Sequence, residues 1–462
     1  MRTDVVVGLD FGSSRIKAAA YDRDGALVAA SSAVTPIVAR EDGDDFLVLE
    51  MLDAAARAIA ELECAPGTMA GIGLSSMGEV GTILTDDGLA DLAFPSWYDR
   101  RGAEIVAALE QEYGTPELLI ATGNHTRVAS TVAKLGHLAT TRELPVGTFL
   151  GLCGALAWQL TGCAWQEAGI AVTSGVYSRD GYLQHLWNSA GLSHVALPPV
   201  LAPGHAEPAS TALANRLGLA TGAPVVIAGH DHPVAAVGAG VRSGELGDSM
   251  GTGEALIAVM QPELAADPVA RAAALQSNRY LSFEVWPPTG ELLVVWERMR
   301  PGLAMRSFIE HGGADRAALD AQAPDSTSGD VFDEAASLAM ENGEPSGVAA
   351  TPEAWAELID YYVRLANSGQ ELVRAATGAD GATVLTGGGL RSSRWRRAKA
   401  TLGRAPMVVS TVEETGTRGC AAMAGVAAGW WSSAETMPGG ERVPVGDDAV
   451  ADMERAVARI AP

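Results

Sequence analysis

The first clear pattern of apolar and polar positions in the chain is the segment 5–25, VVVGLDFGSSRIKAAAYDRDG. Its first run, from Val5 to Leu9, is continuously apolar, which is typical of a strand buried on both faces. A tight glycine–serine turn follows, and the stretch from Ile16 to Tyr21 then predicts the partner strand of a hairpin. Asp10 is therefore expected at the end of the first strand.

The turn of this hairpin has the composition of an anion-binding loop. Gly12 lets backbone N–H groups approach an anion closely, and the hydroxyls of Ser13 and Ser14 add donors. The hairpin tip could hold a phosphate or, through Asp10, a metal ion that is bound to a phosphate. An ordinary hairpin with turn-forming residues explains the same pattern.

A second hairpin is predicted over residues 247–260, GDSMGTGEALIAVM. Its turn, residues 251–253, corresponds to the glycine–serine turn of the first hairpin, so that two halves of the chain begin alike. Before it, the strand 224–228, a glycine turn and a helix of small residues end the first half. We therefore expect two domains, 1–243 and 244–462.

A third glycine-rich loop lies within residues 381–403, where a strand leads into the run 387–389 and then into an Arg-rich helix that Ser392 or Ser393 caps. Strands alternate with helical stretches along the chain, which is typical of the α/β class. A GxxxxGK[ST] motif does not occur, and the first hairpin lacks GxGxxG and continues into a strand. These facts exclude a P-loop and disfavour a dinucleotide site, and they favour two phosphate-binding hairpins that face each other across a cleft.

Composition narrows the choice of partner. The 462 residues are 48% hydrophobic and 19% charged, and the formal net charge of −24 would repel nucleic acid and anionic membranes. A small molecule is the better partner. The 4 cysteines form no CxxC pair, which indicates a reduced, cytoplasmic protein. We find no secretory signal and no apolar run of the roughly 18 residues that a membrane helix needs.

In the order of its motifs, the chain resembles the FGGY carbohydrate kinases of the actin-like ATPase superfamily. The resemblance runs over nearly the whole chain. It implies an α/β fold of two actin-like (ribonuclease H-like) domains, with ATP bound in the cleft between them and the sugar held mainly by the first. The matching segments are GLDFGSSRIKAAAYD (8–22), SWYDRR (96–101), LTG (160–162), LPPVLAPG (197–204), GHDH (229–232), GTG (251–253) and TGGGLRSSRWRRAKATLGRAPMVV (386–409).

The resemblance also implies roles for individual residues. Asp231 matches the general base of phosphoryl transfer, Asp10 matches the carboxylate linked to Mg²⁺, and Asp231 is a further candidate ligand of that ion. Ser13 stands where threonine is commonest in the family, but it keeps the hydroxyl. The residues implied to contact ATP are Gly12, Ser13, Ser14, Lys17, Gly251, Thr252, Gly253, Gly388, Gly389 and Ser392.

The sugar site is carried over in the same way. Its implied residues are Met77, Gly78, Glu79, Trp97, Asp99, Arg100 and His232. Glu79 falls where glycerol kinases have a glutamate and xylulokinases a histidine, whereas Gly78 stands where glycerol kinases have an arginine and makes glycerol itself doubtful. Because the expected pocket gathers Glu79, Asp99 and Asp231, with Arg100 as the nearest cation, an anionic substrate would be repelled, and we expect a neutral ketose, such as a xylulose-like pentulose, or a polyol.

Other interpretations of these residues stay open. Asp231 is also suited to cap the helix that follows it. The run from His230 to His232 is a weaker candidate for a metal cluster, because adjacent strand residues point to opposite faces. Lys17 is one of only three lysines, which suggests a compact point charge near a phosphate or Asp10, although chance explains it equally well.

Three classes of function fit the sequence. The leading one is an ATP-dependent sugar or polyol kinase. The second is a sugar- or nucleotide-binding regulatory protein of the same fold that has lost catalysis, which the divergent segment 312–350 keeps open. The third is an actin-like chaperone or filament ATPase, which the sugar-site residues oppose. The oligomeric state is left open, with a homodimer as one candidate.

Overall fold

The computed structural model describes residues 4–325, 327, 329, 331–446 and 448–460, and the chain in it divides into two compact units. Unit 1 contains the chain up to Gly238 together with Phe283–Leu292 and Glu414–Gly439. Unit 2 contains Ala239–Ser282, Leu293–Glu413 and the chain from Gly440 on. The first division lies near the predicted boundary after residue 243, while two segments from the second half of the chain pack in unit 1.

Unit 1 is built around a six-stranded sheet with the strand order β16-β17-β6-β1-β2-β3. The predicted first hairpin is confirmed, since β1 and β2 pair antiparallel, and β1, β6 and β17 are parallel neighbours. The strands of this sheet are β1 (Val5–Phe11), β2 (Arg15–Tyr21), β3 (Leu27–Val34), β6 (Met69–Ser76), β16 (Ala206–Pro208) and β17 (Pro224–His230).

Smaller sheets complete unit 1. They are formed by β4 (Ile37–Ala39), β5 (Asp44–Leu47) and β9 (Ala93–Pro95); by β7 (Gly81–Thr85), β8 (Gly88–Leu89), β10 (Gly147–Gly151) and β14 (Val195–Ala196); by β11 (Gln166–Glu167) and β15 (Val200–Leu201); and by β12 (Tyr177–Ser178) and β13 (Gly181–Tyr182).

The helices of unit 1 are α1 (Val48–Ala60), α2 (Ala103–Tyr113), α3 (Thr115–Thr122), α4 (Thr131–Thr141), α5 (Leu152–Thr161), α6 (Ala168–Thr173), α7 (Gln184–Ser189), α8 (Ala212–Arg216), α9 (Asp231–Gly238), α17 (Thr415–Ala427) and the 3₁₀ turn η2 (Ala434–Thr436). Alternation along β1 divides its side chains between two layers. Val7, Leu9 and Phe11 join the hydrophobic core, whereas Gly8 and Asp10 lie on the side of α17.

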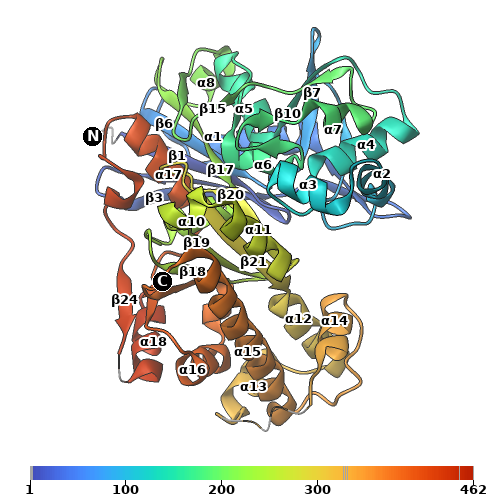
Figure 1. Ribbon diagram of the computed structural model, residues 1–462. Helices are drawn as coiled ribbons and strands as arrows, with labels where there is room; N and C mark the ends of the chain where they lie inside the picture. The colour runs from blue at the N-terminus through green and yellow to red at the C-terminus, as the bar shows by residue number, and fades with distance from the viewer. Residues whose placement is uncertain (1–3, 326, 328, 330, 447, 461–462) are drawn as a thin grey trace. The chain divides into compact units, whose positions relative to one another are not determined.

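Helix α17 approaches the sheet so closely that only glycine fits beneath it. A Cβ atom on Gly8 would lie 1.8 Å from the backbone oxygen of Thr417, and one on Gly73 would lie 2.0 Å from that of Cys420. Figure 1 shows the red helix α17 beside the blue strand β1, although the two come from opposite ends of the chain. Most residues of α17 are accordingly buried.

Unit 2 contains most of a seven-stranded sheet with the order β20-β21-β19-β18-β22-β23-β24, in which β20 continues past Ser282 into the segment that belongs to unit 1. The second predicted hairpin is confirmed as β18 paired with β19, and β22 lies parallel to β18 as β6 does to β1. Its strands are β18 (Leu246–Met250), β19 (Glu254–Val259), β20 (Leu281–Val285), β21 (Leu292–Met299), β22 (Thr383–Thr386), β23 (Met407–Ser410) and β24 (Arg442–Val445).

The long helix α15 is the central helix of unit 2, and α16 and α13 pack beside it (Figure 1). The helices of this unit are α10 (Pro262–Ala266), α11 (Pro268–Ser277), α12 (Pro301–Gly312), α13 (Arg316–Gln322), α14 (Glu334–Glu341), α15 (Pro352–Thr377), α16 (Ser393–Leu402), α18 (Ala449–Val457) and the 3₁₀ turn η1 (Gly388–Arg391). The mixed α/β class predicted from the sequence is confirmed.

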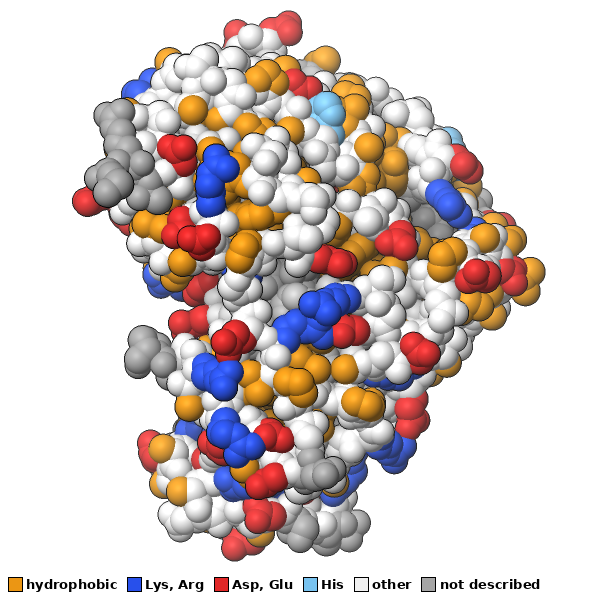
Figure 2. Space-filling model, turned by 90° about the vertical axis from the view of Figure 1, so that its left-hand side faces the viewer, with side chains coloured by type: hydrophobic (Ala, Val, Ile, Leu, Met, Phe, Trp, Pro, Cys, Tyr) orange, Lys and Arg blue, Asp and Glu red, His pale blue; other side chains and the backbone are white. Residues whose placement is uncertain are grey.

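Figure 2 shows one face of the molecule with side chains coloured by type. On the face shown in Figure 2, Lys and Arg side chains are interspersed with Asp and Glu, and hydrophobic side chains form separate patches. Within the described part of the chain, no helix is both long and apolar enough to cross a membrane.

A buried lysine joins the two strands of the second hairpin. The Nζ atom of Lys399 on α16 lies 2.6 Å from Oδ2 of Asp248 and 2.6 Å from Oε1 of Glu254, and the three side chains are at most 1% exposed. Burial raises the pKa of the Glu254 carboxyl well above its ordinary value, although Lys399 opposes this shift. The positive charge of Lys399 therefore pairs with two buried carboxylates, which flank the turn 251–253.

We predict that Lys399→Met strongly destabilises the protein, because it leaves two buried acids without their cation. The expected loss is about 3–5 kcal/mol in the free energy of unfolding, measured by urea denaturation. The matched control is Arg404→Met, since Arg404 pairs with Glu371 at the surface and such pairs contribute at most about 1 kcal/mol. Equal losses for the two variants would contradict this role of Lys399.

Candidate functional site

Polar side chains of unit 1 converge where the parallel strands β1, β6 and β17 end. In the register of these strands Asp10 pairs with Ser75, and Ser75 pairs with Gly229. Neighbouring strands lie about 4.8 Å apart, so residues on β1 and β17 at this edge are separated by about 10 Å. Because parallel strands end at the same edge of a sheet, the register brings Asp10 and the residues after Gly229 into one region.

Asp10 lies in a polar niche on the side of α17. The hydroxyl of Ser75 donates a hydrogen bond of 2.7 Å to its Oδ1, and Lys17 is its cross-strand partner on β2. Burial and, to a lesser extent, the carboxylate of Asp231 together raise the pKa of Asp10 to about 6, although Ser75 and Lys17 act in the opposite direction. Asp10 and Asp231 are therefore close enough to repel each other.

Asp231 begins helix α9 directly after the end of β17. The register of β17 shifts between Ile227 and Gly229, and Gly229 has φ = +132°, a conformation that other residues rarely adopt. This irregularity turns the chain so that Oδ1 of Asp231 accepts a 2.7 Å hydrogen bond from the backbone N–H of His232. The strand continues to His230, two residues beyond the predicted end at 228.

The charge state of Asp231 follows from its neighbours. Burial alone would raise its pKa, but His232, His230 and nearby backbone N–H groups outweigh burial and hold the pKa of Asp231 below its ordinary value. Asp231 is thus ionised at neutral pH. The carboxylate expected to act as a base is in the state that such a role requires.

Glu284 is a site residue that sequence reasoning missed, and His230 was considered there only as part of a weaker metal-cluster candidate. The Nδ1 atom of His230 lies 2.8 Å from Oε2 of Glu284, and its Nε2 atom lies 3.2 Å from Oδ1 of Asp231. Although burial opposes it, the two carboxylates raise the pKa of His230 well above its ordinary value. Glu284 had no local signal, because its segment is far from residues 230 and 231 in sequence.

Two more carboxylates surround this histidine. Burial raises the pKa of Glu79 to about 7 and that of Glu167 to about 7, and the positive charge of His230 lowers both values. Glu167, which was not predicted, caps helix α6, since its Oε2 accepts hydrogen bonds from the N–H groups of Gly169 and Ile170. The site is therefore an acidic cluster around one imidazole.

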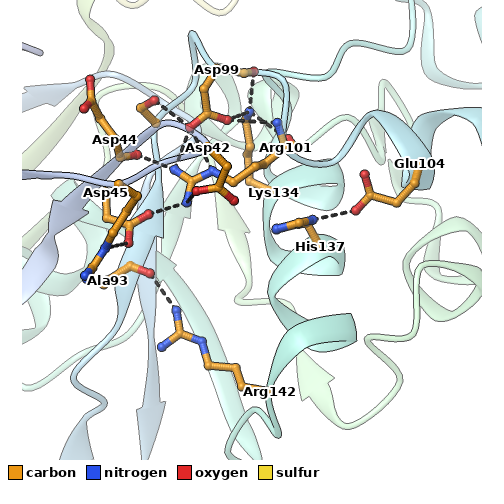
Figure 3. A network of polar contacts seen from close by, with 12 residues as sticks. Asp42, Asp44, Asp45, Ala93, Asp99, Arg101, Glu104, Lys134, His137 and Arg142 are labelled. Carbon is orange, nitrogen blue, oxygen red and sulfur yellow. Dashed lines mark hydrogen bonds and ion pairs between the residues drawn. The ribbon is translucent and has the colours of Figure 1, made fainter.

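Among the predicted sugar-site residues, Asp99 is already engaged within unit 1. Its Oδ2 lies 2.6 Å from Nη2 of Arg101, and its Oδ1 lies 3.0 Å from Nζ of the buried Lys134. Figure 3 shows how Arg101 also reaches Asp45, so that the network anchors the loop before α2 to β5 and α4. Arg100 is exposed and is not part of this network.

The other sugar-site residues lie nearer the first hairpin and α6. The indole N–H of Trp97 donates a 3.1 Å hydrogen bond to the hydroxyl of Ser13. Met77 is buried, and a Cβ atom on Gly78 would lie 2.4 Å from the hydroxyl of Thr173. The arginine that glycerol kinases carry at the position of Gly78 has no room here.

The first predicted phosphate turn lies beside these groups. Gly12 donates its N–H to the carbonyl of Arg15 at 3.1 Å, while Ser14 at the tip is exposed. Nζ of Lys17 lies 2.7 Å from Oε2 of Glu414. Lys17 is thus near Asp10, as one of its two interpretations required, but its direct partner is another carboxylate.

The predicted nucleotide residues of unit 2 form two adjacent loops. The turn 251–253 is tight, with a 3.0 Å hydrogen bond from Gly251 N–H to the Gly253 carbonyl, and Thr252 is exposed. A Cβ atom on Gly389 would lie 2.8 Å from Cβ of Met250, whereas one on Gly388 would meet nothing within 4 Å. Internal packing therefore explains the glycine at 389 but not the one at 388.

Ser392 has the capping role predicted for it. Its hydroxyl accepts a 3.2 Å hydrogen bond from the N–H of Trp395 and donates one of 3.0 Å to Asp320. The side chain is fully buried. The predicted contact of Ser392 with a nucleotide stays untested, and its hydroxyl is already used inside the unit.

We predict that the carboxyl of Asp10 titrates near pH 6 and that Ser75→Ala raises its pKa further, because the hydroxyl of Ser75 stabilises the ionised form. Carbon-13 NMR of labelled aspartate would follow this titration. Ser210→Ala is the control, since Ser210 donates to the carbonyl of Thr161 elsewhere in unit 1. An unchanged Asp10 titration in Ser75→Ala would refute the interaction.

Comparisons with known proteins agree on one family. Residues 5–238 match the model of the FGGY family of carbohydrate kinases, N-terminal domain. The chain is 28% identical over 274 residues to L-fuculokinase from Salmonella typhi, covering 56% of this chain and 57% of that protein. It is 25% identical over 275 residues to apulose kinase from Pectobacterium atrosepticum, covering 56% and 55%. The chain thus matches little more than half the length of these relatives.

Solved structures match over nearly the whole chain. The gluconate kinase from Lactobacillus acidophilus has a TM-score of 0.78 at 17% identity, covering 99% of this chain and 97% of that one. The glycerol kinase from Plasmodium falciparum, determined with ADP, has a TM-score of 0.78 at 13% identity, covering 100% and 99%. These likenesses establish the predicted fold of two actin-like domains.

Proposed function

Since this chain belongs to the FGGY family of carbohydrate kinases, we propose that it transfers the terminal phosphoryl group of ATP to a hydroxyl group of a neutral sugar or polyol. The observation that carries the proposal is the ionised Asp231 at the end of β17, with Asp10 close by on β1. Such a transfer needs a group that receives the proton of the attacking hydroxyl and groups that balance the phosphate charge.

Asp231 is proposed as the general base. Its carboxylate is held by the N–H of His232 and by His230, so its orientation is set before a substrate binds. A low pKa suits this role because the transition state of phosphoryl transfer is loose, and the base mainly positions the hydroxyl and accepts its proton late. The dipole of α9 further favours the ionised form at the helix N-terminus.

The residues at this edge fit a magnesium ion. Asp10 and Asp231 are carboxylates that repel each other, as the raised pKa of Asp10 shows, and carboxylate oxygens are ligands that Mg²⁺ prefers. Asp10, and Asp231 as a further candidate, would hold the ion directly or through water. When bound together with ATP, Mg²⁺ neutralises charge on the phosphates.

Contacts with ATP are assigned to two sets of residues, each within its own unit. In unit 1 they are the turn 12–14 and Lys17, beside Asp10. In unit 2 they are the turn 251–253 and the glycines 388 and 389, where the space above Gly388 favours a ligand contact. In this proposal the segment 1–243 supplies the sugar site and the base, and 244–462 supplies most nucleotide contacts.

The acidic cluster favours a neutral substrate. Glu79, Glu167, Glu284 and Asp231 surround His230, and an anionic sugar would meet net repulsion there. Carboxylates instead accept hydrogen bonds from sugar hydroxyls, and a substrate that lacks the matching hydroxyl leaves a buried acceptor unpaired. A ketose, such as a xylulose-like pentulose, or a polyol fits these groups.

A regulatory protein that has lost catalysis is the alternative function. No observation on the site favours it, because Asp10 and Asp231 are both in place and Asp231 is ionised. The same pair of carboxylates with an acidic sugar site also disfavours a filament-forming ATPase. The kinase therefore remains the function that the geometry supports best.

We predict that Asp231→Asn lowers kcat by about two to four orders of magnitude, the range expected for loss of a general base. ATP binding should stay nearly unchanged, because the carboxylate acts on the acceptor hydroxyl. Coupled ADP release measures turnover, and calorimetry measures ATP binding. Asp180→Asn in the exposed turn after β12 is the control. A variant Asp231→Asn with substantial turnover would exclude this residue as the base.

We predict that Glu79 decides which sugar is preferred. A panel of ketoses, polyols, aldoses and aldonates is assayed with the wild type, Glu79→Ala and Glu79→Gln. The alanine variant should lose discrimination among neutral substrates and show a higher KM, because it loses an acceptor for a sugar hydroxyl. The glutamine variant should keep part of the discrimination among neutral substrates. Either an aldonate as the best wild-type substrate or unchanged ranking and KM in Glu79→Ala would overturn this view of the pocket.

A further inference from the structure

Asn124 holds the first residue of the segment Phe283–Leu292 through two hydrogen bonds. The Nδ2 atom of Asn124 donates a 2.8 Å hydrogen bond to the carbonyl of Phe283, and the N–H of Phe283 donates a 2.7 Å bond to Oδ1 of Asn124. One side chain thus satisfies both backbone groups of one residue. The backbone of Asn124 is itself fixed by Thr122, whose hydroxyl bonds with its N–H and its carbonyl.

The residue next to this clamp is Glu284, which lies in β20 beside β21. The side chain of Glu284 is buried, with 8% of its surface exposed, and its Oε2 lies 2.8 Å from Nδ1 of His230. Burial of a carboxylate is costly unless a partner of fitting geometry meets it. His230 is this partner, and it is similarly buried.

The opposite nitrogen of the same ring faces the proposed base. Nε2 of His230 lies 3.2 Å from Oδ1 of Asp231. The ring of His230 therefore lies between two carboxylates, with Nδ1 hydrogen-bonded to Glu284 and Nε2 in an ion pair with Asp231.

We propose that Glu284 is a positioning residue for phosphoryl transfer, which orients the carboxylate of Asp231 through the ring of His230, and that Asn124 fixes the place of Glu284. This inference rests on the proposed kinase function. A base must point at the attacking hydroxyl, and a misplacement of about 1 Å can cost about 100-fold in rate. The contacts that run from Asn124 through Glu284 and His230 to Asp231 fix the orientation of this carboxylate before the substrate binds.

The residues on either side of this segment belong to the other unit. Residues 282 and 293, which flank the segment, belong to unit 2, and residues 283–292 belong to unit 1. Without the clamp of Asn124, backbone groups of Phe283 would lose their partners in unit 1. Glu284 would then lose the anchor that holds it against His230.

The test compares Glu284→Ala, Glu284→Gln and the matched control Glu291→Ala. Glu291 lies on the same segment, and its carboxylate bonds with the hydroxyl of Thr289 instead of His230. Removing the anchor should lower kcat by about 10- to 100-fold and leave the KM for ATP unchanged. Glutamine keeps an acceptor for Nδ1 and should restore most of the loss, and Glu291→Ala should match the wild type.

A second variant tests the same series of contacts without removing the buried carboxylate of Glu284. Asn124→Ala should reduce kcat in the same way but less than Glu284→Ala, and it keeps the proposal testable if Glu284→Ala folds poorly by circular dichroism. Combining Glu284→Ala with Asp231→Asn should give no further loss beyond Asp231→Asn alone, because both act on one group. A purely structural role of Glu284 predicts losses that add.

The outcomes separate this inference from the proposed function. Wild-type protein that phosphorylates no sugar overturns the kinase proposal and this inference with it. An active wild type that depends on Asp231, together with Glu284→Ala and Asn124→Ala variants of unchanged kcat, overturns the positioning role alone. Additive losses in the double variant overturn it as well.

Discussion

The parallel pairing of β1, β6 and β17 is the constraint on which the site depends. Their register sets Asp10, Ser75 and Gly229 in one row, so the ends of strands that are far apart in sequence meet at one edge. His230 and Asp231 follow within two residues of that row, whereas Glu167 and Glu284 come from other segments of unit 1. A shift of one residue in any of these strands would turn Asp10 or His230 to the opposite face of the sheet.

The electrostatics of the site follow from this crowding. Carboxylates gather around His230 with little solvent, which raises the pKa of Asp10, Glu79 and Glu167. The same histidine and the N–H groups at the start of α9 keep Asp231 ionised. Burial thus raises the pKa of Asp10, Glu79 and Glu167, whereas at Asp231 the two histidines and the backbone N–H groups outweigh burial.

The sequence predicted the parts of the site that local pattern determines. Asp10 and Asp231 follow apolar strands, and the glycine turns and the Ser392 cap have local signatures that the structure confirms. Glu284 and Asn124 carry no such signature, because their partners are distant in the chain: His230 lies 54 residues from Glu284, and Phe283 lies 159 residues from Asn124. The engagement of Asp99 by Arg101 was also beyond reach, since strand and loop patterns do not say which way neighbouring side chains turn.

The packing of α17 has a consequence for the order in which this protein forms during synthesis. Strands β1 and β6 leave the ribosome early, but the helix that covers Gly8 and Gly73 is made only when residues 415–427 have been translated. Until then, the face of the sheet that bears Asp10 lacks its cover. The domain whose strands are translated first is therefore completed among the last, and the nascent chain must keep that face from other partners for most of its elongation.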